Sequence, residues 1–326
     1  MQWKKKFVMA ALSVSLTAVV SPAIFTSEAL CAPREAIPVD CPVRAEDVFY
    51  QNSGMRFFVP KELDGLLLTE TPRKGEHGPG RLFSVSERAS IAAAKASGHE
   101  VDGAGWLFDI GWVDEQHFHE ILCGDMSGAE IFARDSEGNR FVFYHPTDVR
   151  YMRENNEAMK RDMPQWERLN QWAWQSVRGD FILDNLCDNL GNVLTPETYD
   201  NSSVAMALAR IAYRPGTKCT ISTTQYGSLA PSKEKAAPFV EQLIRNASYE
   251  IVDLKEAPDG EYVVLDFPED NIRFDFFQMS GKENYVREVR ADGGETFYKA
   301  SFADGITKAS DVMQRWYWAI AERRGK

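Results

Sequence analysis

Residues 106–113 read Trp-Leu-Phe-Asp-Ile-Gly-Trp-Val, and this segment has the clearest pattern in the 326-residue chain. Large apolar side chains occupy every second position, and successive side chains of a β-strand point to opposite faces of the sheet. The pattern predicts a strand with one buried face, formed by Trp106, Phe108, Ile110 and Trp112. Asp109 is expected on the other face, either in solvent or, if a helix covers that side too, buried and hydrogen-bonded.

Further strands and helices are expected on both sides of this segment. Before it, a strand pair spans Phe49 to Pro60 and an Ala-rich helix spans Ser86 to Ser97. After it, Asp114 is placed to cap a short helix. A long helix follows, which Pro164 is expected to open, because proline is favoured at the first helical position. The second half predicts a meander of strands between helices, at Tyr249–Val252, Glu261–Phe267, Ile272–Met279, Tyr285–Val289 and Thr296–Ala300.

Strands in series with helices at the ends are typical of antiparallel sheets. We therefore expect an α+β fold of two domains, each a mainly antiparallel sheet packed against helices. Turn-forming residues between Cys187 and Pro196 indicate the boundary between the domains. The expected organisation is a signal peptide at 1–29, a linker at 30–45, a first α+β domain at 46–187, a linker at 188–200 and a second α+β domain at 201–326.

The first 29 residues have the pattern of a secretory signal peptide. Three lysines at positions 4–6 precede the apolar stretch Phe7–Val20, and small residues follow. Pro22 ends the apolar stretch before it reaches the roughly 20 residues that a membrane-spanning helix needs. We expect cleavage after Ala29, with Ala23 and Ala32 as the alternatives. The mature protein is then exported, to the extracellular medium, the cell wall or the periplasm, and has no transmembrane segment.

The chain is acidic, with 37 Lys and Arg against 48 Asp and Glu and a formal net charge of −11. Nucleic-acid affinity comes mostly from cationic contacts to phosphates. The longest positive cluster lies at the extreme C-terminus, in Arg323–Lys326. The composition argues against nucleic acid and anionic membrane surfaces as partners. A peptide, a sugar or another envelope protein remain the candidate partners.

The cysteines leave the disulfide state open. Cys41, Cys123, Cys187 and Cys219 all follow the expected cleavage site, and their spacing is irregular, unlike that of a disulfide scaffold. Export permits disulfides. Cys187 and Cys219 are the first pair to consider, because both flank one expected helix.

The segment His117–Cys123 is the nearest approach to a catalytic motif. Zinc protease helices carry His-Glu-x-x-His, because residues four apart share a helix face and can bind one metal. Here His119 and Glu120 are followed by Cys123 in place of the second histidine. Glu115, His119 and Cys123 do form an i, i+4, i+8 stripe of metal-ligand types. The alternative is a surface helix whose Cys123 packs inward, and the sequence favours it, since no further ligand cluster completes a site. No catalytic residue, metal or cofactor is therefore predicted.

Three other groups of residues carry weaker signals. His145 precedes Pro146 at a strand end, where active-site residues often lie, although a hydrogen-bonded structural histidine is favoured. Four carboxylates, Asp266, Glu269, Asp270 and Asp275, cluster across an expected hairpin, and their separation would decide any glycosidase role. Three tryptophans, Trp172, Trp174 and Trp318, lie off the apolar stripes of their helices. Exposed aromatic side chains of this kind can bind sugars or peptides.

Three short motifs occur in order in the first half: Phe57-Phe58-Val59-Pro60-Lys61-Glu62, Gly105-Trp106-Leu107-Phe108-Asp109-Ile110 and Tyr144-His145-Pro146-Thr147-Asp148-Val149. This order resembles a domain of uncharacterised secreted and lipid-anchored bacterial envelope proteins, with the pattern Pro-x-Glu, Gly-x-Leu-Phe-x-Ile and Tyr-Pro-Thr-Asp-Val. The chain departs from that pattern by inserting His145 before the proline. The resemblance covers about Val48–Asn185 and implies an envelope location and a fold, with no activity.

Together these observations favour an exported bacterial envelope protein that acts as a non-catalytic binding or interaction module. An envelope hydrolase that uses carboxylates or a metal is the first alternative. A purely structural envelope component is the second.

Overall fold

The computed structural model describes residues 46–72, 80–98, 103–124, 128–185, 194–255, 257, 260–279 and 283–322. All of them belong to one compact unit of the chain, Val39–Lys326. The expected signal peptide and linker at 1–45 lie outside the described residues.

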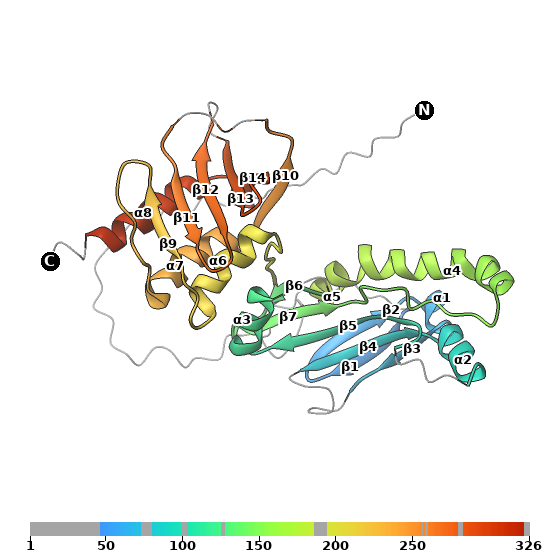
Figure 1. The fold of residues 1–326 in the computed structure, drawn as a ribbon. Helices are drawn as coiled ribbons and strands as arrows, with labels where there is room; N and C mark the ends of the chain where they lie inside the picture. The colour runs from blue at the N-terminus through green and yellow to red at the C-terminus, as the bar shows by residue number, and fades with distance from the viewer. Residues whose placement is uncertain are drawn as a thin grey trace, which may run out of the picture. The chain divides into compact units, whose positions relative to one another are not determined.

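The first half is built on a six-stranded sheet in which every neighbouring pair is antiparallel. Its strand order is β3-β4-β5-β7-β6-β8, and a separate hairpin, β1-β2, accompanies it (Figure 1). The strands are β1 Val48–Asn52, β2 Met55–Val59, β3 Leu67–Glu70, β4 Arg81–Glu87, β5 Trp106–Val113, β6 Ala129–Arg134, β7 Arg140–Tyr144 and β8 Thr195–Pro196. The expected strand pair at Phe49–Pro60 is therefore the hairpin β1-β2.

Helices and the hairpin cover one face of this sheet. The helices of the first half are α1 Lys61–Asp64, α2 Arg88–Ala96, α3 Glu115–Cys123, α4 Asn156–Gln175 and α5 Val177–Asn185. The core under α4 and α5 is rich in phenylalanine: Phe57, Phe83, Phe108, Phe143 and Phe181 are all almost completely buried. Ring pairs such as Phe108 and Phe143, whose centroids are 5.1 Å apart, stack within this core.

Strand β5 forms where the alternating pattern predicts it, but a β-bulge changes the face of its first residue. Phe108 and Ile110 are fully buried in the phenylalanine-rich core. Trp106 pairs with Ser86 and Asp109 pairs with Ser84, so the register shifts between Val85 and Ser86. Since Ser84 and Ser86 point to the same side, the shift places Trp106 on the Asp109 face. The expectation that Trp106 shares the face of Phe108 is wrong, because the pattern cannot show the extra residue.

Asp109 itself has no exposed surface. The Trp106 indole Nε1–H donates to Asp109 Oδ1 over 2.9 Å, and Arg81 Nη1 lies 2.9 Å from Asp109 Oδ2. The buried, hydrogen-bonded alternative for Asp109 is therefore the correct one.

Helix α4 begins earlier than the sequence indicates. Asn155 caps it by accepting from the Ala158 N–H over 2.9 Å, and Pro164 lies inside the helix, not at its first position. The Asn155 cap outweighs the proline as a start signal, because it satisfies a free backbone N–H at the helix end. The prediction that Pro164 opens this helix is wrong.

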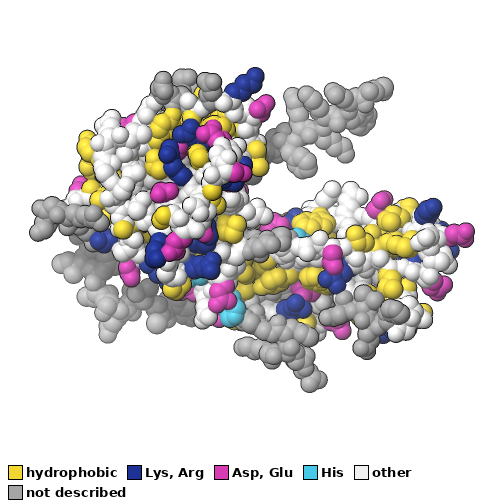
Figure 2. All heavy atoms as spheres, in the orientation of Figure 1, with side chains coloured by type: hydrophobic (Ala, Val, Ile, Leu, Met, Phe, Trp, Pro, Cys, Tyr) yellow, Lys and Arg dark blue, Asp and Glu magenta, His cyan; other side chains and the backbone are white. Residues whose placement is uncertain are grey.

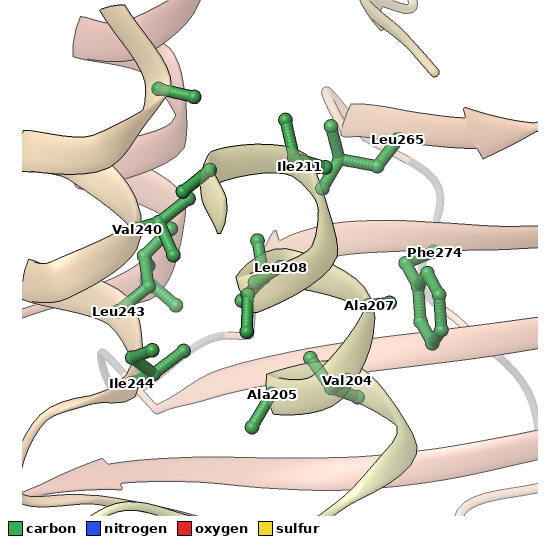
Figure 3. Close-up of a cluster of buried hydrophobic side chains, with 14 of the residues drawn as sticks. Val204, Ala205, Ala207, Leu208, Ile211, Val240, Leu243, Ile244, Leu265 and Phe274 are labelled. Carbon is green, nitrogen blue, oxygen red and sulfur yellow. The ribbon is translucent and has the colours of Figure 1, made fainter. Parts of the chain in front are cut away.

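The second half contains another six-stranded antiparallel sheet, of order β10-β14-β13-β12-β11-β9. The strands are β9 Thr220–Thr223, β10 Ala247–Val252, β11 Val263–Phe267, β12 Ile272–Gln278, β13 Asn284–Arg290 and β14 Glu295–Phe302. Each of the five expected meander strands is present, within two residues of its expected ends. The helices are α6 Ser203–Tyr213, α7 Lys233–Ile244 and α8 Ala309–Ala321. Figure 3 shows apolar side chains of α6 lying between α7 and the strands.

Helix α3 packs against helix α6, so the two halves share apolar contacts. The core cluster of the second half also takes in Phe118 and Leu122 from α3 and Val142 from β7. The Phe118 ring lies 5.1 Å from the ring of Tyr199. Within the segment expected as a linker, Thr195–Pro196 forms β8 against β6, and Tyr199 bridges to Arg245 of the second half. The two-domain organisation stays a prediction.

The α+β class expected from the sequence is confirmed, with sheets that are antiparallel throughout the described residues. No helix in the same part of the chain is both long enough and apolar enough to cross a membrane. Among the described residues, Cys123 and Cys219 are free thiols. Cys187, the partner suggested for Cys219, lies outside the described residues.

Candidate functional site

Helix α3 carries the residues that the sequence analysis considered as metal ligands. Asp114 caps the helix as expected, by accepting from the His117 N–H over 2.9 Å. His119 Nε2 lies 3.9 Å from Glu115 Oε1, so the predicted stripe does bring these two together. The His119 ring, however, stacks on the ring of Tyr213 at 4.0 Å and 10°. Burial lowers the pKa of His119 below its ordinary value, which keeps the ring neutral in this contact.

The other two candidate ligands on α3 have separate surroundings. Cys123 packs against the apolar cluster beside α6, and burial raises the pKa of its thiol. Glu120 is on the exposed side, where it accepts from Gln116 Nε2 over 3.0 Å. Within the described ranges, no three His, Cys, Asp or Glu side chains are grouped in a way that would hold a metal ion. His119 and Cys123 of the stripe contribute to the packing of α3 on α6, while Glu115 is exposed.

Three of the four carboxylates of the β11-β12 hairpin, Asp275, Glu269 and Asp270, are held in separate ion pairs. Asp275 is buried between the guanidinium groups of Arg273 and Arg287, both of which donate to it with two nitrogens. Glu269 pairs with Lys218 at 2.6 Å, and Asp270 pairs with Arg210 at 3.0 Å. These contacts neutralise each carboxylate locally, and they give the cluster a structural role.

A pocket of about 460 Å³ opens where the ends of β6, β7 and α4 meet the segment before α6 and the start of β10. Its size falls within the roughly 300–1,000 Å³ of small-molecule sites. The lining combines one large aromatic side chain with several polar ones: Ala129, Glu130, His145, Trp174, Thr198, Tyr199, Asp200, Asn201, Ala247 and Ser248.

Trp174 forms the aromatic wall of this pocket. It lies in the last turn of α4 and is 40% exposed, as expected from its place off the apolar stripe of the helix. Three neighbours fix its ring: Phe143 contacts it edge-on at 5.7 Å, His145 lies 4.4 Å away, and the Arg178 guanidinium lies 5.5 Å away. The indole therefore offers a fixed, flat apolar surface to the pocket.

His145 lines the same wall and is held through its backbone. Its N–H donates to the Gly128 carbonyl over 3.0 Å, which ties the end of β7 to the start of β6. Its Nδ1 lies 3.3 Å from the Pro146 carbonyl oxygen. The histidine that interrupts the Tyr-Pro-Thr-Asp-Val pattern is thus a pocket residue in contact with Trp174.

Of the two carboxylates in the pocket, Glu130 has a cationic partner and Asp200 has only backbone partners among the described residues. Glu130 forms an ion pair with Arg178, whose guanidinium also lies over the rings of Phe143 and Trp174. Asp200 accepts from two backbone donors, the Ser202 N–H at 2.8 Å and the Tyr249 N–H at 3.2 Å. No lysine or arginine pairs with Asp200 in the part of the chain that the structure describes. Asp200 is therefore a fixed carboxylate with spare acceptor capacity.

The loop that carries Asp200 is anchored to the start of β10. Asn246, which has a positive φ of 50°, donates its N–H to the Thr198 carbonyl over 2.8 Å and accepts from the Thr198 N–H over 2.9 Å. This two-way contact fixes the pocket rim from Thr198 to Asn201.

Sequence reasoning found part of this site. It singled out His145 by its place before a proline, and Trp174 and Trp318 by their places off the apolar stripes of their helices. Trp318 is 43% exposed, but it lies on α8 and outside the pocket. Trp172 instead packs on the core, 5.7 Å from Phe108. Glu130 and Asp200 were missed. The available signal for Asp200 was the Asp-Asn-Ser-Ser run before α6, which is typical of a helix start.

Comparisons with family models, curated proteins and solved structures found no match to this chain. The function is therefore argued from the site alone.

Proposed function

We propose that this chain is an exported bacterial envelope protein that acts as a non-catalytic binding module, and that the pocket around Trp174 is its ligand site. The observation that carries the proposal is the half-exposed Trp174 indole, which faces a concave surface beside the fixed carboxylate of Asp200. A mostly preformed pocket with one aromatic wall and a few oriented polar groups is typical of ligand sites.

The contacts of the pocket residues favour binding over catalysis. Asp200 is oriented by two backbone N–H groups, and Glu130 is occupied by Arg178. Groups held in this way are suited to accept hydrogen bonds from a ligand. Both carboxylates are thus held in one orientation without a ligand, which is typical of a preformed binding site.

Export and envelope location rest on the sequence pattern of the first 32 residues. The acidic composition supports a polar, uncharged or peptide partner over a polyanion. On the face seen in Figure 2, Lys and Arg side chains are interspersed with Asp and Glu. Mass spectrometry of the secreted protein should find a chain that begins just after Ala23, Ala29 or Ala32. Retention of Met1 would contradict this part of the proposal.

The binding role can be tested with fluorine-labelled tryptophan. Full-length protein containing 5-fluorotryptophan gives one ¹⁹F signal for each tryptophan, and the Trp174→Phe variant identifies the signal of Trp174. Neutral oligosaccharides, oligolysine peptides and polygalacturonate are then added one at a time. We expect at least one class of probe to shift the Trp174 signal in a saturable way and to leave the Trp318 signal unchanged.

Trp318 provides the matched control, because it is exposed to almost the same extent as Trp174 and lies on α8, away from the pocket. Equal shifts of both signals would indicate nonspecific contact with exposed indoles. A Trp174 signal that no probe shifts would refute the proposed site.

A further inference from the structure

The walls of the pocket around Trp174 also restrict the chemistry of its ligand. Its largest apolar surface is a single flat indole, fixed by Phe143, His145 and Arg178. A flat surface of this kind packs against a flat apolar face of the ligand. A ligand that is apolar all round does not fit, because it would strip water from Glu130, Asp200 and Asn201 without replacing their hydrogen bonds.

The charge of the pocket argues against an anionic ligand. Arg178 is already paired with Glu130, so its positive charge is balanced within the wall. Asp200 has no cationic partner among the described residues and leaves a net negative charge at the rim. A carboxylate, sulfate or phosphate of a ligand would lie close to Asp200 and be repelled by it.

The polar groups of the pocket are mostly hydrogen-bond acceptors, so they require a ligand that mainly donates hydrogen bonds. Asp200 uses one acceptor position on each oxygen for backbone donors and has further positions on both oxygens. Glu130 adds a second carboxylate, while Asn201, Thr198 and Ser248 can both donate and accept. Several adjacent hydroxyl groups on one side of a ring meet this requirement.

We infer that the ligand is a neutral carbohydrate, with the C–H face of one sugar ring stacked on Trp174 and ring hydroxyls donating to Asp200. The inference rests on the proposed function, since it specifies the ligand of the same pocket. A pyranose combines a flat apolar face with donor hydroxyls around its edge and carries no charge. It therefore satisfies the aromatic wall, the free acceptors and the charge of the pocket together.

The test measures the affinity of full-length protein for neutral oligosaccharides by isothermal titration calorimetry. The probes are malto-, cello- and chito-oligosaccharides, with oligolysine and polygalacturonate as the cationic and anionic alternatives. We expect one neutral series to bind. Trp174→Ala should weaken that binding about tenfold or more by removing the stacking surface, and Asp200→Asn should weaken it about tenfold by removing the charged acceptor.

Two variants control for general effects. Trp318→Ala removes an indole of equal exposure outside the pocket, and Asp311→Asn removes an exposed carboxylate on α8, so both should bind like the parent. Thermal unfolding of each variant establishes that it is folded. If Asp200→Asn does not fold, Asn201→Ala on the same rim takes its place, with a smaller expected loss of affinity.

The outcomes separate the ligand class from the binding role. Binding of oligolysine or polygalacturonate that Trp174→Ala abolishes, with no binding of neutral sugars, would overturn the inference of a neutral carbohydrate and keep the binding module. Binding of neutral sugars that both pocket variants leave unchanged would overturn the inference as well. Absence of any Trp174-dependent binding would overturn the proposed function itself.

Discussion

Asp109 lies in the middle of β5, between the indole of Trp106 and the guanidinium of Arg81. A buried carboxylate is tolerated only when hydrogen bonds and opposite charge replace its lost hydration. Its two partners come from the bulged end of the same strand and from β4. The polar face of the sheet therefore depends on the bulge that the alternating pattern could not show.

Two substitutions on β5 test this arrangement. Phe108→Ala should lower the free energy of unfolding by about 3–5 kcal/mol, because it leaves a cavity in a closely packed core. Asp109→Ala should cost about 1–3 kcal/mol, because it leaves the Trp106 N–H without its partner, while the partly exposed Arg81 can be hydrated. Urea denaturation measures both. Glu120→Ala, on the exposed side of α3, should change stability by less than about 0.5 kcal/mol. A stability equal to the parent for Asp109→Ala would show that the carboxylate is not an integral part of the sheet.

His119 makes the stability of the α3–α6 contact depend on pH. Burial lowers its pKa in the folded protein, while Glu115 opposes this shift and Lys233 and Arg140 reinforce it. The unfolded chain binds a proton near the ordinary histidine pKa of about 6.5, before the folded protein does. The stability that neutral His119 contributes is therefore complete above this pH and is lost as the pH falls below it, through the lower pKa of the folded protein.

The Phe variant isolates this effect, since it keeps an aromatic ring against Tyr213 and cannot titrate. Free energies of unfolding for the parent and for His119→Phe, measured between pH 7.5 and 5, should diverge as the pH falls. The parent loses stability relative to the variant. Parallel curves would mean that His119 is as easily protonated in the folded state as in the unfolded one.

At the scale of elements, α4 shows how competing start signals are resolved. Pro164 has no N–H to donate to the carbonyl four residues earlier, yet the helix continues from Asn156 through it to Gln175. Apolar side chains on the buried face, Leu169 and Ala173 among them, anchor the part that follows. The packing of α4 on the first sheet compensates for the missing hydrogen bond.

Pro164→Ala should therefore stabilise the protein by about 1–3 kcal/mol, because it restores a hydrogen bond and removes a clash in the helix interior, less the entropy that proline takes from the unfolded chain. Asn155→Ala should destabilise it by about 1 kcal/mol through loss of the cap. Chemical denaturation measures both effects. If Pro164 opened the helix, as its sequence position suggested, the first substitution would be neutral or destabilising and the second would have no effect.

Local sequence predicted the elements of the second half better than those of the first. Turn residues such as those at Pro258–Gly260 and Asp292–Gly294 separate the meander strands, so short-range signals suffice to place them. The bulge in β5 depends on pairing with Ser84 and Ser86 of β4, which the local pattern of β5 cannot show. The start of α4 is set by the local Asn155 cap, which competes with the start signal of Pro164. The pocket is a stronger case, because Glu130, Trp174, Asp200 and Ser248 are far apart in the chain and only the folded sheets bring them together.

At the scale of the whole molecule, the segment between the halves is firmly attached beyond Leu194. Leu194 is fully buried, β8 pairs with β6, and the Glu197 carboxylate is buried between Arg134, Arg140 and Tyr199. Turn residues precede this attached part, at Asp188–Asn192. A protease needs an accessible, extended segment, so buried and hydrogen-bonded backbone resists it.

Limited proteolysis of the native protein should therefore cut first between Cys187 and Leu194, which gives two fragments on a denaturing gel. Because α3 packs on α6 and the core cluster takes side chains from both halves, the fragments should elute together in native size-exclusion chromatography. Phe118→Ala removes a buried ring of α3 that contacts Tyr199, so this variant should let the nicked fragments separate. Phe49→Ala, an exposed ring on β1, should leave them associated. Separate elution of the fragments of the parent protein would show that the shared cluster does not hold the halves together. Resistance of the 187–194 segment to cleavage would show that the predicted domain boundary is wrong.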